Sequence, residues 1–161
     1  MRFQLDLTKE YGIVLEGGGA RGSYQIGAWK ALREAGIKIR GIAGASVGAL
    51  NGALICMDDL EKAEKIWENI RYSQVMDVDD TVIETVKNLD LKSLDLMKVA
   101  EDAKRILRDK GFDITPLKNL IESVVDEEKI RQSDRELYMT TYSVTDRKLL
   151  VLNAKDIPEG E

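Results

Sequence analysis

Hydrophobic and polar residues follow one another along the first third of the chain in a pattern that predicts two strands and two helices. Residues 11–15 (YGIVL) and 37–42 (IKIRGI) are short, apolar and β-branched, which is typical of buried strands. Between them, residues 21–35 place small and apolar side chains at helical spacing until Gly36 ends the helix. Residues 47–57 are rich in alanine and leucine and predict a second helix. This order is typical of an α/β domain with right-handed βαβ crossovers.

The middle of the chain is predicted to be mostly helical. Residues 58–61 (DDLE) have the pattern of a capping box, which would open a helix that continues to about residue 70. We expect a loop over 72–80, a short helix over 81–89 and a strongly amphipathic helix over 93–110. Residues 115–116 (TP) then supply an N-cap and a proline at the first position of another helix.

Near the C-terminus the hydrophobic period changes from helical to alternating. Residues 136–144 and 148–152 predict two strands joined by a turn at 145–147. We find no interdomain linker, so residues 1–161 are expected to belong to a single domain.

Composition narrows the classes of protein that fit this pattern. Apolar residues make up 43% of the 161 residues and charged residues 33%, which is ordinary for a soluble domain. The net charge of −5 disfavours nucleic acid as a partner, because phosphate binding needs a clustered basic face. Cys56 is the single cysteine, the N-terminus is a poor signal peptide and no apolar run is long enough to span a membrane. Together these features predict a cytoplasmic location.

The chain contains no histidine, which excludes a Ser-His-Asp triad and a histidine-ligated metal. A serine nucleophile is nevertheless indicated by residues 44–48 (GASVG), a G-x-S-x-G sequence between a predicted strand and a predicted helix. In a nucleophile elbow, Gly44 and Gly48 would leave room for a sharp turn that presents Ser46 above the sheet. The pentapeptide alone also fits a glycine-rich helix start in which the serine side chain caps the helix.

A second glycine-rich segment, residues 17–22 (GGGARG), follows the first predicted strand. Backbone N–H groups that no side chain shields can bind an anion, which in acyl transfer is the oxyanion of the tetrahedral intermediate. This segment and Ser46 follow consecutive strands, so we expect them to meet at one edge of the sheet. The predicted oxyanion-hole residues are Gly17, Gly18, Gly19, Arg21, Gly22 and Val47. Arg21 could assist the loop directly or anchor it through an ion pair.

The same segment also matches the dinucleotide-binding pattern G-x-G-x-x-G. A nicotinamide site would require an acidic residue at the end of the second strand, to hold the ribose hydroxyls. Residues 42–46 (IAGAS) contain no acid at that place. The dinucleotide interpretation is therefore the weaker of the two.

The two motifs and the small-residue helix that follows Ser46 resemble the patatin-like phospholipase family, and they are similar to its bacterial cytoplasmic members. The resemblance is strong over residues 11–57 and looser over 112–152. It implies a three-layer α/β/α fold with a central, mainly parallel sheet. It also implies a Ser-Asp dyad that works without histidine.

The family carries its catalytic aspartate in an Asp-Gly motif late in the domain, and this sequence contains no Asp-Gly pair. We therefore expect the base beyond residue 161, and we interpret the chain as the N-terminal part of the hydrolase domain, incomplete at its C-terminus. On its own, residues 1–161 are expected to be inactive and prone to self-association.

The resemblance further implies a fatty-acyl ester or phospholipid substrate, transient contact with a membrane surface, and no metal or organic cofactor. The alternative is a non-catalytic lipid- or partner-binding module that keeps the fold. The intact Ser46 and both intact glycine motifs favour the enzyme.

Overall fold

The computed structural model describes residues 5–71 and 115–160. The chain divides into one compact unit made of residues 1–68 and 125–161 and a second made of residues 69–124. The predicted loop over 72–80 and the predicted helices over 81–89 and 93–110 lie outside the described residues. The second unit contributes helix α6 (Thr115–Val124), which begins at the predicted place.

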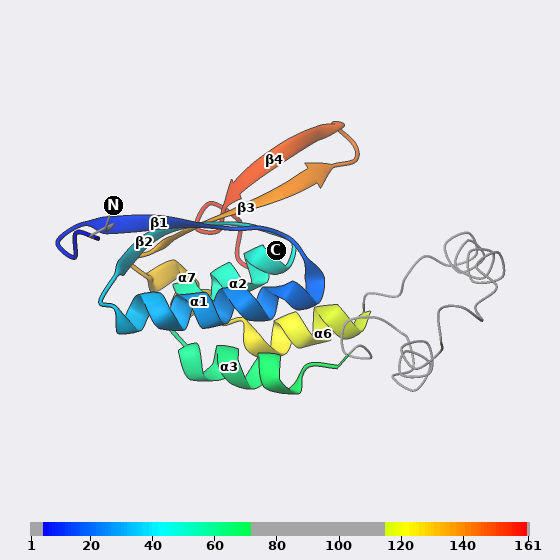
Figure 1. The fold of residues 1–161 in the computed structure, drawn as a ribbon. Coiled ribbons are helices and arrows are strands. Elements are labelled where there is room, and N and C mark those ends of the chain that lie inside the picture. The colour runs from blue at the N-terminus through cyan, green and yellow to red at the C-terminus, as the bar shows by residue number, and fades with distance from the viewer. Residues whose placement is uncertain (1–4, 72–114, 161) are drawn as a thin grey trace, which may run out of the picture. The chain divides into compact units, whose positions relative to one another are not determined.

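The first unit is built on a four-stranded sheet in the order β1-β2-β3-β4 (Figure 1). Strands β1 (Glu10–Leu15), β2 (Lys38–Ala45) and β3 (Glu136–Ser143) are parallel, and β4 (Lys148–Asn153) pairs antiparallel with β3. The predicted α/β class and mainly parallel sheet are therefore confirmed. The carboxyl ends of β1 and β2 lie side by side, because Leu15 is in register with Gly44.

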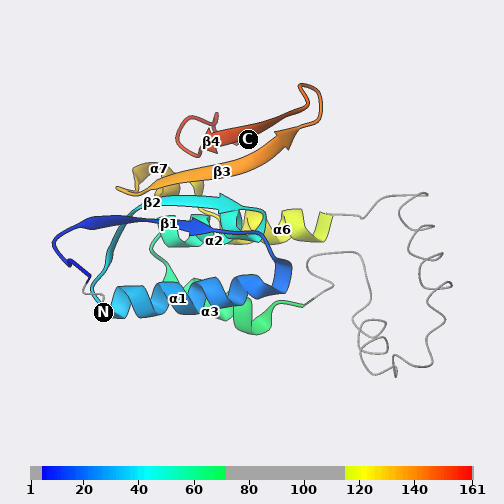
Figure 2. The same ribbon diagram turned by 45° about the horizontal axis from the view of Figure 1, so that its top comes forward.

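Helices of this unit cover one face of the sheet (Figures 1 and 2). A short 3₁₀ turn, η1 (Gly19–Arg21), leads into α1 (Gly22–Glu34), and α2 (Val47–Cys56) packs beneath β2 and β3. Helices α3 (Leu60–Asn69) and α7 (Glu127–Gln132) complete this layer. Because α2 is apolar except for Asn51 and seven of its residues are buried, it is the centre of the unit.

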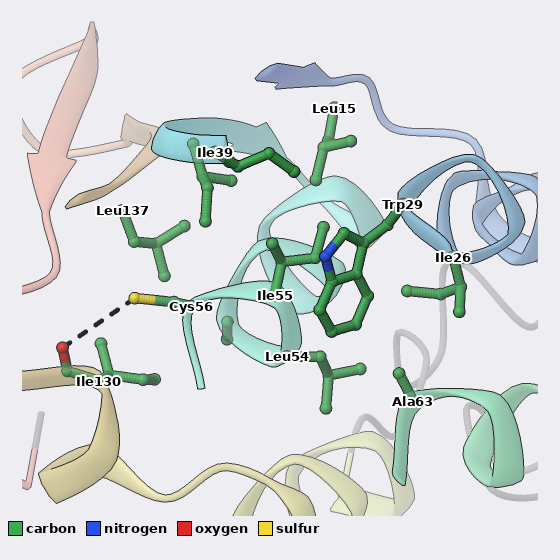
Figure 3. Packing of buried hydrophobic residues seen from close by; sticks show 12 residues of the cluster. Leu15, Ile26, Trp29, Ile39, Leu54, Ile55, Cys56, Ala63, Ile130 and Leu137 are labelled. Atoms are coloured by element: carbon green, nitrogen blue, oxygen red, sulfur yellow. Dashed lines mark hydrogen bonds between the residues drawn. The ribbon is translucent and has the colours of Figure 1, made fainter. Parts of the chain in front are cut away.

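The hydrophobic core lies between α2 and the sheet (Figure 3). Ile42 from β2, Ile55 from α2 and Leu137 from β3 are almost fully buried, and each contributes about 1.5–3 kcal/mol of hydrophobic stabilisation. Trp29 from α1 and Ile130 from α7 close the cluster at its sides. The core therefore joins segments more than 100 residues apart in sequence, such as Ile26 and Leu137.

The opposite face of the sheet carries apolar side chains that the described residues leave open. Val14 on β1 is 85% exposed, and Val151 on β4 is 61% exposed. Tyr138 lies in the same row of the sheet as Val14, through Ala43 of β2. Within residues 5–71 and 115–160, the helices of this unit cover only the other face; the second helical layer implied by the resemblance is not among them.

Two details of the local structure differ from the sequence predictions. The capping box at residues 58–61 does not form, because Asp59 rather than Asp58 caps α3 by accepting a hydrogen bond from the backbone N–H of Lys62 (3.1 Å). Asp58 instead has a φ of 57° and pairs with arginines. Helix α7 was not predicted, since its six residues are too few to show a helical period.

Candidate active site

Ser46 lies at the sharp turn between the end of β2 and the start of α2. Its backbone has φ 53° and ψ −126°, a conformation that costs a residue with a side chain of order 1–3 kcal/mol. The side chain makes no hydrogen bond that caps α2, and the residue is exposed. The helix-cap interpretation of this serine is therefore wrong, and the strained, outward-facing geometry is the one that a nucleophile elbow requires.

The flanking glycines are required because the start of α2 passes directly over the ends of β1 and β2. A Cβ atom on Gly44 would lie 2.6 Å from the backbone nitrogen of Ala49. A Cβ atom on Gly48 would lie 2.8 Å from the carbonyl oxygen of Glu16, and it would collide with that of Leu15. All of these contacts are with backbone atoms, which cannot move aside. Glycine is therefore needed at both positions of the pentapeptide, because α2 starts so close to the ends of the two strands.

The glycine-rich loop meets Ser46 at this edge of the sheet. A Cβ atom on Gly17 would lie 3.2 Å from Cβ of Ser46 and 3.9 Å from its Oγ. Gly18 and Gly19 are exposed, and Gly19 has a φ of 54°, in the left-handed region that favours glycine. The Arg21 N–H donates to the carbonyl of Gly18 (3.2 Å) and closes the turn. The structure therefore brings together the two motifs that the sequence predicted to converge.

The remaining members of the predicted oxyanion hole occupy different places. Val47 is the first residue of α2 and directly follows Ser46. Arg21 is exposed, and within residues 5–71 and 115–160 its side chain has no ion-pair partner. Gly22 is buried behind the loop, where a Cβ atom would lie 2.7 Å from both Val47 and the Trp67 ring. Gly22 thus allows the loop to pack closely against α2, which contains Val47, and α3, which contains Trp67.

Sequence reasoning missed a chain of side-chain hydrogen bonds that begins inside α2. Asn51 donates from Nδ2 to the carbonyl of Gly22 (2.9 Å) and to Oε1 of Gln25 (2.8 Å). Its Oδ1 accepts from Nε1 of Trp67 (2.8 Å), and Nε2 of Gln25 donates to the carbonyl of Glu16 (2.8 Å). The available signal was one asparagine in the otherwise apolar helix sequence VGALNGALIC.

An open cleft of about 680 Å³ runs from the glycine loop along β1 and α1. Its walls include Val14 and Leu15 of β1, Gly17 and Gly18 of the loop, and Tyr24 of α1. Val14 and Tyr24 are 85% and 81% exposed, so this part of the wall is apolar and open to solvent, whereas Glu16 and Arg21 add charged groups to the lining. Ser46 does not line this cleft, but Gly17 does, and a Cβ atom on Gly17 would lie 3.2 Å from Cβ of Ser46.

In the part of the chain that the structure describes, Ser46 has no acidic hydrogen-bonding partner. No Asp or Glu side chain of residues 5–71 or 115–160 hydrogen-bonds to its Oγ.

The one cysteine, Cys56, lies at the far end of α2, where burial raises the pKa of its thiol. Its Sγ contacts the carbonyl oxygen of Ile130 (Figure 3) and that of Arg135. Cys56 is therefore a buried, free cysteine.

Comparisons with known proteins point to one family. The family described as patatin-like phospholipase matches residues 13–159. Lysophospholipase nte1 of Aspergillus terreus is 58% identical over 50 residues, and neuropathy target esterase sws of Drosophila sechellia is 57% identical over 47 residues. These matches cover 31% and 29% of the chain and 3% of each relative, so the chain spans a small part of their length.

A solved structure supports the same fold. VipD from Legionella pneumophila matches with a TM-score of 0.53 and 14% sequence identity. The match covers 92% of this chain and 40% of VipD. The curated relatives named above come from a fungus and an insect, so the narrower prediction of a bacterial cytoplasmic subtype stays a prediction. Among the described residues, no helix has the length and apolar character needed to cross a membrane.

Proposed function

Because the chain belongs to the patatin-like phospholipase family, we propose that it carries the nucleophile of a lipid acyl hydrolase and that Ser46 is this nucleophile. The observation that carries the proposal is the geometry of Ser46. Its side chain is exposed and caps no helix, its φ is 53°, and Gly17 leaves free space next to its Oγ. A protein retains such backbone strain where the surrounding structure enforces it, most often at functional sites.

In the proposed reaction, Ser46 Oγ attacks the carbonyl carbon of an acyl ester while its proton passes to an aspartate, which we place after residue 161. The carbonyl oxygen becomes an oxyanion that accepts hydrogen bonds from N–H groups of Gly18, Gly19 and Val47. The C–O bond to the alcohol then breaks, and the alcohol leaves with the proton. Water attacks the acyl-serine in the same way and releases the fatty acid and free Ser46.

The proposed substrates are fatty-acyl esters, including phospholipids. The cleft beside the glycine loop supports this class, because its apolar wall adjoins the place where the ester carbonyl would lie. We propose that the enzyme contacts a membrane surface transiently, works in the cytoplasm, and needs neither a metal nor an organic cofactor. Lysophospholipase nte1 bears the name of one such activity.

The decisive experiment replaces Ser46 in a full-length protein that carries this sequence. Ser46→Ala should lower the hydrolysis of p-nitrophenyl butyrate by a factor on the order of 10⁴–10⁶. It should also abolish covalent labelling by a fluorophosphonate. The matched control is Ser123→Ala, which removes the hydroxyl of an exposed serine on α6 and should leave both readouts unchanged. Wild-type turnover by Ser46→Ala would contradict the assignment.

The same probe separates the enzyme from its alternatives. A non-catalytic binding module of the same fold would bind lipid vesicles without labelling by the fluorophosphonate. A dinucleotide-binding domain would show saturable binding of a nicotinamide dinucleotide through residues 17–22, and family membership makes this outcome unexpected.

A further inference from the structure

We propose that Asn51, Gln25 and Trp67 are positioning residues that hold the glycine loop against Ser46; this inference rests on the proposed function of Ser46. Residues 17–19 are three consecutive glycines, so this part of the loop has no side chain through which the rest of the protein could fix it. Its position must be set through the backbone on either side. Those are the two places where the hydrogen-bonded side chains attach.

Side-chain hydrogen bonds hold the loop at both of its ends. The carbonyl of Glu16, directly before the glycines, accepts from Nε2 of Gln25 (2.8 Å). The carbonyl of Gly22, at the end of the loop where α1 begins, accepts from Nδ2 of Asn51 (2.9 Å). Asn51 and Gln25 are themselves joined by a 2.8 Å hydrogen bond. The three bonds tie both ends of the loop to α2, the helix that begins next to Ser46.

The direction of every bond in this chain is determined by Trp67. An indole N–H can only donate, so the atom of Asn51 that faces Nε1 of Trp67 must be the carbonyl oxygen. The amide nitrogen of Asn51 then faces Gly22 and Gln25 with its two N–H donors. Gln25 must therefore present its oxygen to Asn51 and its nitrogen to Glu16. A reversed amide at either residue would place like groups against each other.

The burial of Asn51 argues that this arrangement is specific. Its side chain is 1% exposed, and among the described residues it is the one polar residue in the buried set. Burying an amide is costly unless all its hydrogen-bonding groups are satisfied. An apolar residue of the same size would fill the space at less cost, but it could not hold Glu16 or Gly22. The cost is offset by the hydrogen bonds that orient the loop.

Small displacements of this loop would reach the nucleophile, because Gly17 follows Glu16 and lies next to Ser46. A Cβ on Gly17 would be only 3.2 Å from Cβ of Ser46, so the backbone of Gly17 lies close to the side chain of Ser46. Stabilisation of an oxyanion depends on donors that are already in place, and a misplacement of about 1 Å can lower the rate about 10²-fold. The three side chains would therefore affect the chemical step more than substrate binding.

The principal test is Gln25→Met in the full-length protein, which keeps the length of the side chain but removes its hydrogen bonds. With p-nitrophenyl butyrate, kcat should fall about 10- to 100-fold, a larger change than that in KM, although Gln25 also lines the cleft. The matched control is Gln132→Met on α7. Gln132 is an exposed glutamine that also bonds to a neighbouring side chain, Glu128, but it is not bonded to the glycine loop. The kcat of this control should equal that of the wild type. A wild-type kcat for Gln25→Met, or a loss confined to KM, would overturn the inference.

A double-mutant cycle tests whether the residues act as one unit. If Asn51 and Gln25 hold the loop together, Gln25→Met should lower kcat much less in an Asn51→Leu background than in the wild type. Ile55→Val, which removes one buried methyl group from the same helix, controls for loss of stability and should keep the wild-type kcat. Independent, multiplicative losses in kcat would contradict a shared network.

Trp67→Phe supplies a further variant, since it keeps an aromatic ring but removes the donor that orients Asn51. Its kcat should fall less than that of Gln25→Met, and an unchanged kcat would remove Trp67 from the proposal.

Ser46→Ala is measured in the same assay. If that variant stays active, the proposed function fails; if it is inactive while Gln25→Met is fully active, only the positioning role fails.

Discussion

The two ends of the parallel strands in this protein are held together by opposite means. The serine end, residues 15–22 and 44–48, consists largely of backbone packed on backbone, and the side chains that bond to it among the described residues are neutral. The arginine end comprises Arg33, Asp58 and Arg135. There, Arg135 donates to the carbonyls of Ile39 (3.3 Å) and Ile55 (2.9 Å) and to the carboxylate of Asp58 (3.0 Å). Asp58 also pairs with Arg33 (3.3 Å).

The difference teaches where this fold tolerates change. A guanidinium on a flexible stem can adjust its position and still satisfy several acceptors. Where a backbone carbonyl packs directly on a glycine, no such adjustment is possible. Replacing the glycine by alanine adds a methyl group, which would displace the strand or the helix. Substitutions at the serine end should therefore alter catalysis, and substitutions at the arginine end should alter only the free energy of unfolding.

Among the substitutions that compare the two ends, Gly48→Ala at the serine end should have the largest effect. The added methyl group would meet the backbone of Leu15 and Glu16. Overpacking of this kind typically costs about 1–3 kcal/mol, and it should also displace Ser46 and remove most esterase activity. The measurement is thermal unfolding together with ester turnover. The matched control is Gly27→Ala on α1, where a Cβ would meet nothing within 4 Å; it should raise stability by up to about 1 kcal/mol.

Gly17→Ala should lower activity while leaving the fold almost unchanged. Its methyl group would lie 3.2 Å from Cβ of Ser46 and 3.5 Å from the carbonyl oxygen of Ala45, which is crowded but not impossible. By displacing the nucleophile or the loop, it should lower kcat about 10- to 100-fold. A normal kcat combined with a large loss of stability would show that this contact supports folding rather than catalysis.

Arg135→Met tests the arginine end. It removes the donors to two backbone carbonyls and to Asp58, so the free energy of unfolding should fall by about 1–3 kcal/mol. Because these groups lie at the opposite end of the strands from Ser46, kcat per folded molecule should not change. Denaturant titration and active-site labelling measure the two quantities separately. A fall in kcat would break the distinction between the two ends.

The smallest effect is a pH dependence at the C-terminal segment. Hydrogen bonds from Arg131 and from the backbone of Gly160 hold the pKa of Glu127 below its ordinary value of 4.5. A lowered pKa means that the carboxylate stabilises the fold above pH 4.5 and loses this contribution as pH falls through the lower, folded value.

The melting temperature of Glu127→Gln should therefore lie slightly below that of the wild type at pH 7, and the gap should close in acid. Glu128→Gln, on the same helix, is the control and should show a smaller gap. A gap that widens as pH falls would contradict the assignment.

Much of the candidate site could be predicted because its signals are local. The elbow pentapeptide and the glycine loop each follow a recognisable strand, and parallel strands bring their carboxyl ends together. The side chains that support the site could not be predicted in this way. Asn51 lies 16 residues from Trp67 and 26 from Gln25, and neither spacing is a signal on its own. The capping box failed for a related reason: Asp58 bonds to Arg135, 77 residues away.

The sequence by itself determined the order of strands and helices, the α/β class and the place of Ser46 at a strand-to-helix turn, because hydrophobic period and glycine spacing are properties of neighbouring residues. Only the tertiary structure decided that the serine side chain leaves its helix uncapped, that Gln25 and Asn51 bond to the two ends of the glycine loop, and that Arg135 closes the opposite end of the strands. These outcomes depend on how the elements pack. Hydrogen bonds between residues as far apart as Ile39 and Arg135, separated by 96 positions, exist only once the sheet has formed.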